Sequence, residues 1–316
     1  MRILVGGSHG LIGTALVSRL QELDHSVVRL VRNDPEQDDI LWQMTDDTVD
    51  IDAFEGFDAV INLAGRSIGE KRWRKSETKL IWNSRVLSTE FLTMRLAEVV
   101  NRPEVYIGAS AVGYYGSRGR TSLDEESSRG EGFLADLCKE WEDSANPARE
   151  AGIRVVNLRS GIVLSPEGGV LKRQLPLFKL GIAGRLGSGE QFLPWIALTD
   201  EVNAIIHLLT HRRLSGPFNV TSPNPVTNVE FTATLGKVLG RPTFIPAWKW
   251  MLDLTFGRQL TQETLLASQR VMPKKLLDSG FKFKHPVLEP ALEEMLARAS
   301  DKTDDKKTGP DDKSAS

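Results

Sequence analysis

The 316-residue chain is poor in cysteine, tyrosine and histidine: it contains one, three and five of them, respectively. A single cysteine, Cys138, allows neither an internal disulfide nor a metal cluster held by cysteines. Only His207 and His211 are spaced so that one helix face would present both, and no glutamate lies between them. We therefore expect no metal site.

The chain also lacks long apolar runs and an excess of charge of one sign. No stretch approaches the roughly 18 uninterrupted apolar residues of a transmembrane helix, and the first residues read as a strand rather than as a signal peptide. The 40 Lys and Arg nearly balance the 42 Asp and Glu, which gives no reason to expect a nucleic-acid partner. The sequence thus predicts a cytoplasmic protein, monomeric or homodimeric, that contacts neither membrane nor nucleic acid.

What the sequence does contain is a glycine-rich turn near its start. An apolar run at residues 2–5 leads into Gly7, Gly10 and Gly13, and a helical apolar pattern and a second apolar run at residues 27–31 follow. Such glycines tolerate positive φ, let the backbone approach a pyrophosphate and let the helix pack closely on the strand. The phosphates then lie at the positive end of the helix. A β–α turn without a ligand is the alternative. The predicted dinucleotide-binding residues are Gly7, Gly10, Leu11, Ile12 and Gly13.

Arg32 ends the second predicted strand, where NAD-binding proteins commonly carry an acid that accepts hydrogen bonds from the ribose. A guanidinium matches a phosphate in charge and in geometry, so Arg32 favours the 2′-phosphate of NADP(H). The alternative is that Arg32 is a solvated surface residue and that Asp34 supplies the acid.

Strand and helix patterns alternate from the first residue to about residue 165. This alternation predicts an α/β protein with a Rossmann-type, doubly wound parallel sheet in residues 1–165. Further strands are expected at residues 57–65, 105–110 and 154–159, and long helices at residues 77–100 and 133–150.

Beyond residue 165 the prolines and glycines become denser and the alternation ends. We expect residues 166–298 to form a smaller, mainly helical, substrate-covering lobe, with sheet elements returning at about residues 199–221. Residues 299–316 are mostly polar and cannot bury an apolar face, so they are predicted to be a disordered tail.

Four segments, read in order, carry a resemblance to a known family. They are GSHGLIG at residues 7–13, NLAG at 62–65, SAVGYYG at 110–116 and RSGIV at 159–163. Together they resemble the extended short-chain dehydrogenase/reductase superfamily. More narrowly, the chain resembles the "epimerase family protein" branch, which is similar to NAD-dependent epimerases and dehydratases, over nearly its whole length.

The resemblance implies a Rossmann sheet, bound NADP(H) and a C-terminal substrate lobe. It implies that residues 63–65 run beside the adenosine side of the cofactor, that Ser110 lies near the nicotinamide and that residues 161–163 pass its amide. Arg85 belongs to a basic stretch more typical of a solvated surface, but the branch is similar at Ser84-Arg85. The cofactor-binding residues implied in this way are Leu63, Ala64, Gly65, Arg85, Ser110, Gly161 and Ile162.

The chain departs from the superfamily at its usual proton donor, a Tyr-x-x-x-Lys pair on the helix after the Ser110 strand. The tyrosines are Tyr106, Tyr114 and Tyr115, and none lies at residues 133–150. Ser110 is then expected to orient the substrate, and Tyr115 is the best remaining phenolic acid. The other options are the carboxylates of the helix, namely Asp136, Glu140 and Glu142.

Two functions remain open at this point. The first is an NADP(H)-dependent oxidoreductase or epimerase-like enzyme that acts on an unidentified small molecule by hydride transfer without the Tyr–Lys pair. The second is a non-catalytic NADP(H)-binding regulatory or scaffold protein. Because some plastid and cyanobacterial relatives are associated with division, this second function includes a link to cell division.

Overall fold

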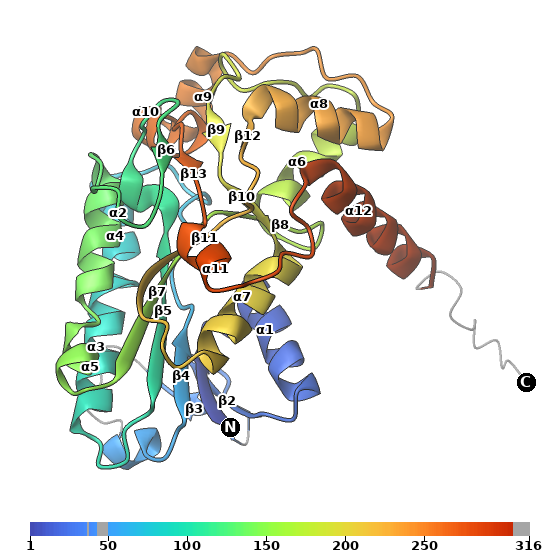
Figure 1. Ribbon diagram of the computed structural model, residues 1–316. Helices are drawn as coiled ribbons and strands as arrows, with labels where there is room; N and C mark the ends of the chain where they lie inside the picture. Colours follow the sequence, from blue (N-terminus) through green and yellow to red (C-terminus); the bar gives the residue numbers. More distant parts are fainter. Residues whose placement is uncertain (37, 43–49, 306–316) are drawn as a thin grey trace, which may run out of the picture.

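The computed structural model describes residues 1–36, 38–42 and 50–305, and its centre is a seven-stranded parallel sheet (Figure 1). The strand order is β11-β7-β5-β4-β1-β2-β3. The Rossmann-type α/β fold predicted from the alternation is therefore confirmed. The strands of this sheet are β1 (Arg2–Gly6), β2 (Ser26–Val31), β3 (Ile40–Leu41), β4 (Ala59–Asn62), β5 (Val105–Ala111), β7 (Arg154–Ser160) and β11 (Gly216–Val220).

Helices cover both faces of the sheet, which is why its central strands are apolar on both sides. On one face, α1 (Leu11–Glu22) and α7 (Leu198–Thr210) share an apolar core with the strands. On the other face, α3 (Val86–Glu98) and α5 (Asn146–Glu150) close a second core. Figure 1 shows these two helical layers on opposite sides of the strands, with α4 (Phe133–Asp143) beside α3.

The chain reverses its direction of winding at β1. This strand pairs with β2 on one side and with β4 on the other, and Gly6 lies level with both Leu30 and Asn62. In open parallel sheets, ligands bind outside the carboxyl ends of the strands at such a switch point. The carboxyl ends of β1, β2 and β4 therefore mark where a cofactor would bind.

Two predicted helices are each divided in the structure. The helix expected at residues 77–100 forms α2 (Lys75–Asn83) and α3, separated at Ser84 and Arg85. The Ser84 hydroxyl donates to the Ile81 carbonyl and accepts from the backbone N–H of Arg66, which ends the first helix. The helix expected at residues 133–150 forms α4 and α5, because proline at the start of α5 cannot donate to the preceding turn.

The remaining elements follow β7, apart from short ones within the first half of the chain. Those short ones are η1 (Ile51–Phe54), η2 (Val112–Tyr115) and β6 (Ser122–Leu123). The later elements are β8 (Ile162–Leu164), α6 (Gly169–Lys179), β9 (Phe192–Leu193), β10 (Trp195–Ala197), β12 (Val226–Thr227), α8 (Asn228–Leu239), α9 (Lys249–Phe256), α10 (Arg258–Leu260), a π-helix η3 (Thr261–Leu265), β13 (Arg270–Val271), α11 (Lys274–Asp278) and α12 (Leu288–Asp305).

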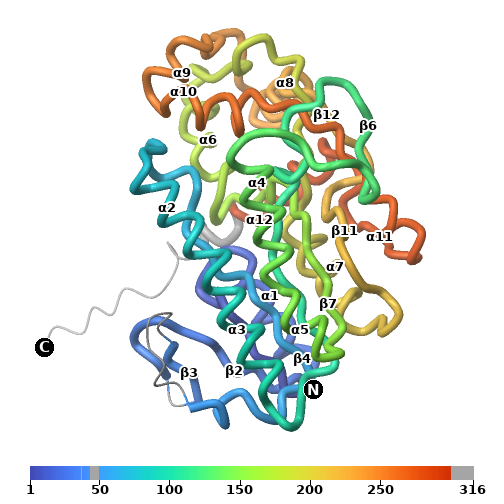
Figure 2. Tube along the Cα trace, turned by 90° about the vertical axis from the view of Figure 1, so that its left-hand side faces the viewer, coloured from blue at the N-terminus to red at the C-terminus, as the bar shows by residue number. Residues whose placement is uncertain are grey.

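Much of this second half lies beyond the carboxyl ends of the strands. Figure 2 shows α6, α8, α9 and α10 together at the upper end of the molecule, above the sheet. A third apolar core joins α6, α8 and α12. Helix α12 continues to Asp305, so residues 299–305, which were expected in the disordered tail, are helical; residues 306–316 lie outside the described part. Among the residues described, no helix has the length and apolar character needed to cross a membrane.

Candidate functional site

The glycine turn after β1 is packed so tightly that neither residue 7 nor residue 13 can carry a side chain. Gly7 has φ +76°, and a Cβ atom on Gly13 would lie 2.2 Å from the Gly7 carbonyl oxygen. Gly10 caps α1 in an extended conformation and, lacking a side chain, makes no side-chain cap hydrogen bond. The amides of Leu11, Ile12 and Gly13 therefore keep the unfilled donor capacity of a helix N-terminus, which suits an anion.

A second loop lies against this turn and follows β4. A Cβ atom on Gly7 would lie 2.6 Å from the Leu63 carbonyl carbon. The buried Asn62 side chain fixes the loop, because its Oδ1 accepts from the Ala64 N–H at 3.1 Å while its Nδ2 donates to Thr89 and to Tyr106. Sequence reasoning quoted Asn62 within a motif but gave it no role; an asparagine that ends an otherwise apolar strand is the signal that could have found it.

Arg85 lies against the same loop because the helix breaks there. A Cβ atom on Gly65 would lie 3.2 Å from the Arg85 guanidinium carbon. That guanidinium is 5.1 Å from the ring centroid of Trp141 and donates to the Ile81 carbonyl. Burial lowers the pKa of Arg85 to about 10, so it stays protonated at neutral pH. The structure thus brings Arg85 beside Gly65.

Arg32 follows β2 directly and is exposed. The register of β1 and β2, Gly6 with Leu30, places the residues after β2 next to the glycine turn. Within the described residues, no ion pair or hydrogen bond occupies the Arg32 guanidinium, which leaves it free for an anionic group. Asp34, the alternative acid, is exposed and adopts φ +48°.

Ser110 ends a buried polar network between β5, α4 and β7. Its hydroxyl donates to Glu142 Oε1 at 2.7 Å. Arg159 donates to both oxygens of the same carboxylate, at 2.8 and 2.9 Å. Since Arg159 and Glu142 are only 3% and 8% exposed, the pair interacts with little screening by water.

Tyr115 lies inside the protein, contrary to what a proton donor requires. It is 0% exposed, its hydroxyl donates to Asn219 Oδ1 at 2.7 Å, and it accepts from Arg159 at 2.9 Å. Burial raises its pKa to about 12. The expectation that Tyr115 acts as the phenolic acid is at odds with this geometry, because a general acid must reach the substrate proton directly or through one water.

Apolar side chains occupy the start of α4, the helix that follows the Ser110 strand. The Phe133 ring packs edge-on against Trp73, with centroids 5.2 Å apart, and also contacts Trp82. Glu263 Oε2 accepts from the backbone N–H of Leu134 at 2.8 Å. Of the three carboxylates considered as alternative acids, Asp136 and Glu140 are exposed and Glu142 is buried.

The loop after β7 connects the sheet to the second half of the chain. The N–H of Gly161 donates to Val220 and that of Ile162 to Pro194, and a Cβ on Gly161 would lie 2.1 Å from the Pro194 oxygen. Just before it, the Ser160 hydroxyl donates to Oε1 of Glu201 at 2.6 Å. Glu201 is fully buried, and burial raises its pKa to about 8.

Residues 3–221 match the family model described as "NAD dependent epimerase/dehydratase family", and residues 249–295 match "Domain of unknown function (DUF1731)". This chain belongs to the NAD-dependent epimerase/dehydratase family. The resemblance read from the sequence is therefore confirmed. An epimerase family protein of Mycobacterium leprae is 40% identical over 299 residues, which cover 94% of this chain and 96% of that protein.

Solved structures give the same result. The human epimerase family protein SDR39U1, crystallised with NADPH, superposes with a TM-score of 0.87 at 34% identity, covering 94% of this chain and 99% of the human one. A nucleoside-diphosphate sugar epimerase of Corynebacterium glutamicum superposes with a TM-score of 0.77 at 32% identity, covering 99% of this chain and 62% of that one. The chain is thus an epimerase-like protein with an NAD(P)-binding fold.

Proposed function

We propose that this epimerase-family protein binds NADP(H) and acts as an oxidoreductase or epimerase on a small molecule. The observation that carries the proposal is the glycine turn: only glycine fits at residues 7 and 13, and the uncapped α1 N-terminus follows directly. A helix N-terminus approached by bare backbone is the geometry that binds a pyrophosphate. The relative crystallised with NADPH supports the same cofactor.

We assign each part of the cofactor to residues of this chain. Gly7 and residues 10–13 would hold the pyrophosphate, residues 63–65 with Arg85 the adenosine side, and Gly161 and Ile162 the nicotinamide amide. We assign the 2′-phosphate to Arg32, because its exposed guanidinium has no partner among the described residues. When bound, the nicotinamide supplies or accepts hydride.

We further propose that the proton passes through Ser110 and Glu142 in place of the missing Tyr–Lys pair. The Ser110 hydroxyl already donates to Glu142, so the serine oxygen keeps its lone pairs free to accept from a substrate hydroxyl. As that proton arrives, the proton of Ser110 can move to Glu142. Arg159, bidentate on Glu142, holds the carboxylate in place.

We assign the substrate to the space between the sheet and residues 166–298, which we propose to be a substrate-covering lobe. Among the contacts that connect this lobe to the sheet domain, two involve α1 and α4. A Cβ on Gly168 would lie 2.9 Å from the Leu11 side chain, and Glu263 accepts from the first turn of α4.

A second candidate, a non-catalytic NADP(H)-binding regulatory protein, is favoured by one observation. Helix α4, which follows the Ser110 strand, carries no tyrosine from Phe133 to Asp143. This candidate binds the cofactor equally well but does not turn it over.

The test has two parts. Fluorescence titration with NADPH and NADH should show tighter binding of NADPH, and equal affinities would refute the cofactor assignment. A panel of aldehydes, ketones and nucleotide sugars is then screened for oxidation of NADPH or reduction of NADP⁺. With an active compound, Ser110→Ala and Glu142→Gln should each reduce kcat by about 10²–10⁴-fold, while Glu140→Gln, exposed on the same helix, should not. Binding without any turnover would favour the regulatory candidate.

A further inference from the structure

A basic hollow lies at the end of the sheet opposite to the glycine turn. It forms where β7 and β11 begin, since the first residues of these strands, Arg154 and Gly216, line it. Strand β7 has seven residues, so the hollow lies about 20 Å from Ser160, at a rise of about 3.3 Å per residue. A ligand bound here would therefore lie apart from a cofactor at the carboxyl ends of the strands.

Four arginines from α5, β7 and the loop after α7 line this hollow. They are Arg149, Arg154, Arg212 and Arg213. Among the residues that the structure describes, the lining contains no aspartate or glutamate, while the buried Ile153 and Val155 add apolar surface. The volume is about 450 Å³, which falls within the roughly 300–1,000 Å³ of small-molecule sites. The hollow thus has the size of a ligand site and charge of one sign.

Most of this positive charge has no carboxylate as a partner. Arg212 pairs with Glu104 at 3.0 Å, but both side chains are more than half exposed, so water and salt screen this pair. Arg149 donates to the side-chain oxygen of Asn146 rather than to an acid. The exposed Arg213 makes neither an ion pair nor a hydrogen bond within the part of the chain that the structure describes. Its guanidinium is therefore available to a ligand.

Arg154 covers the groups that would otherwise repel an anion. The last carbonyls of a helix carry partial negative charge, and Arg154 donates to those of Leu208 and Leu209 at the end of α7, at 3.0 and 3.1 Å. It also donates to the Leu214 carbonyl at 2.7 Å, which holds the loop that carries the other two arginines against β7. These bonds use three of the five N–H groups of a guanidinium, so the basic arrangement is fixed by the fold.

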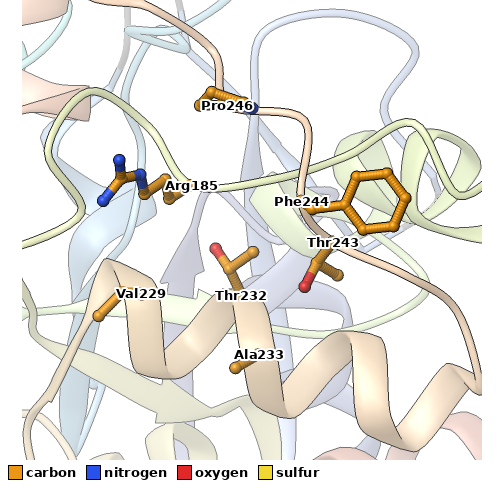
Figure 3. Close-up of a pocket in the computed structure, with 7 residues that line it drawn as sticks. All are labelled: Arg185, Val229, Thr232, Ala233, Thr243, Phe244 and Pro246. Carbon is orange, nitrogen blue, oxygen red and sulfur yellow. The ribbon is translucent and has the colours of Figure 1, made fainter.

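A hollow between α8 and residues 243–246 differs in its charge. Figure 3 shows Arg185 beside valine, alanine, threonine, phenylalanine and proline side chains, and it is the one arginine among the described residues that line this hollow. The Arg185 guanidinium donates to the Ser188 carbonyl at 3.2 Å. A single guanidinium attracts a multiply charged anion much less than four do, so Arg185 is a suitable control residue.

We propose that the basic hollow binds a small anion that carries at least two phosphate groups. The guanidinium fork matches the oxygens of a phosphate in charge and in geometry, and a hollow lined by one sign of charge with apolar walls strengthens the local potential. Four guanidinium groups exceed the charge of a single phosphate or carboxylate. A compact anion with several phosphates is therefore the ligand that this lining fits.

The experiment measures binding of inorganic triphosphate and of ATP to the full-length protein by calorimetry, with saturating NADPH present. One equivalent of triphosphate should bind, and tighter binding of ATP would show that the nucleoside also contributes. Arg149→Gln and Arg213→Gln should each raise Kd about tenfold, since each removes a charge-assisted hydrogen bond. Arg185→Gln is the control and should leave Kd unchanged. Because Arg149 and Arg213 are exposed, the melting temperatures of their variants should stay close to that of the wild type.

The absence of saturable binding by either compound overturns the proposal, as does binding that both glutamine variants leave unchanged. Triphosphate that NADPH displaces would belong to the cofactor loops and would equally overturn it. Binding of single-stranded RNA but of neither small anion would assign the arginines to a nucleic acid instead and would refute the small-anion site. The comparison of the variants does not depend on whether the protein turns over NADPH.

Discussion

Replacing Glu142 by glutamine should destabilise the folded protein more than any other single change of a charge in the network around Ser110. The substitution keeps the shape of the side chain but removes the charge that faces Arg159. Both residues are buried, and both nitrogens of the Arg159 fork are used on the carboxylate. Removing one partner leaves a buried, uncompensated guanidinium, which costs about 3–5 kcal/mol.

The effect is measured by urea denaturation of the protein without cofactor, followed by circular dichroism. Glu140→Gln on the same helix is the matched control, because Glu140 is exposed and its replacement should change the free energy of unfolding by less than about 0.5 kcal/mol. A double variant, Glu142→Leu with Arg159→Leu, removes both charges and should lose less stability than the sum of the two single changes.

The result that would refute the reasoning is an unchanged free energy of unfolding in Glu142→Gln. Water would then be solvating Arg159, and the network would not be a buried ion pair. The measurement also bears on catalysis: if Glu142→Gln abolishes turnover while the protein remains folded at the assay temperature, the catalytic loss is separate from the structural one.

Three further predictions follow from the same geometry. Gly13→Ala should lower the free energy of unfolding by about 1–3 kcal/mol, because its Cβ atom would overlap backbone atoms of Gly7 and Ser8. Gly10→Ala is the control: Gly10 has φ −75°, so this variant should fold normally while binding NADPH more weakly. Arg32→Ala should bring the affinities for NADPH and NADH closer together in a fluorescence titration, and an unchanged ratio would exclude Arg32 from the 2′-phosphate. Burial raises the pKa of Glu201 to about 8 in the folded protein, whereas the same carboxyl has a pKa of 4.5 in the unfolded chain. Between pH 4.5 and pH 8 the folded protein therefore holds a proton that the unfolded chain has released. The free energy of unfolding of the wild type should fall relative to that of Glu201→Gln as the pH rises through this range. Parallel stability curves for these two proteins over that range would contradict the assignment.

The sheet could be predicted from the sequence because its causes are local. Apolar runs of strand length, each followed by a helical pattern, specify the parallel strands without any knowledge of their neighbours. The glycine turn is of the same kind, since the spacing of Gly7, Gly10 and Gly13 reflects contacts among residues close in the chain.

The features that escaped prediction depend on residues far apart in the chain. The Ser84 hydroxyl, which ends α2, accepts a hydrogen bond from the backbone N–H of Arg66, 18 residues away. The helical pattern of the sequence is continuous there, so it did not predict the break that places Arg85 beside Gly65. Tyr115 follows Ser110 closely in sequence, yet its hydroxyl is held by Asn219, 104 residues away. Glu142 had a readable signal, an acid on the apolar side of a helix, but its partner Arg159 is on another strand.

The late position of β11 in the chain affects how the sheet is completed during synthesis and which fragments are expected to stay soluble. Strand β11 pairs with β7 along five residues, from Gly216 with Val156 to Val220 with Ser160, yet it is synthesised more than fifty residues after β7 ends. Until residues 216–220 leave the ribosome, β7 presents an open edge, which is a template for pairing with other chains. A fragment that stops near residue 165 would keep the whole glycine turn and still expose this edge. The shortest piece that is expected to remain soluble therefore extends at least through β11.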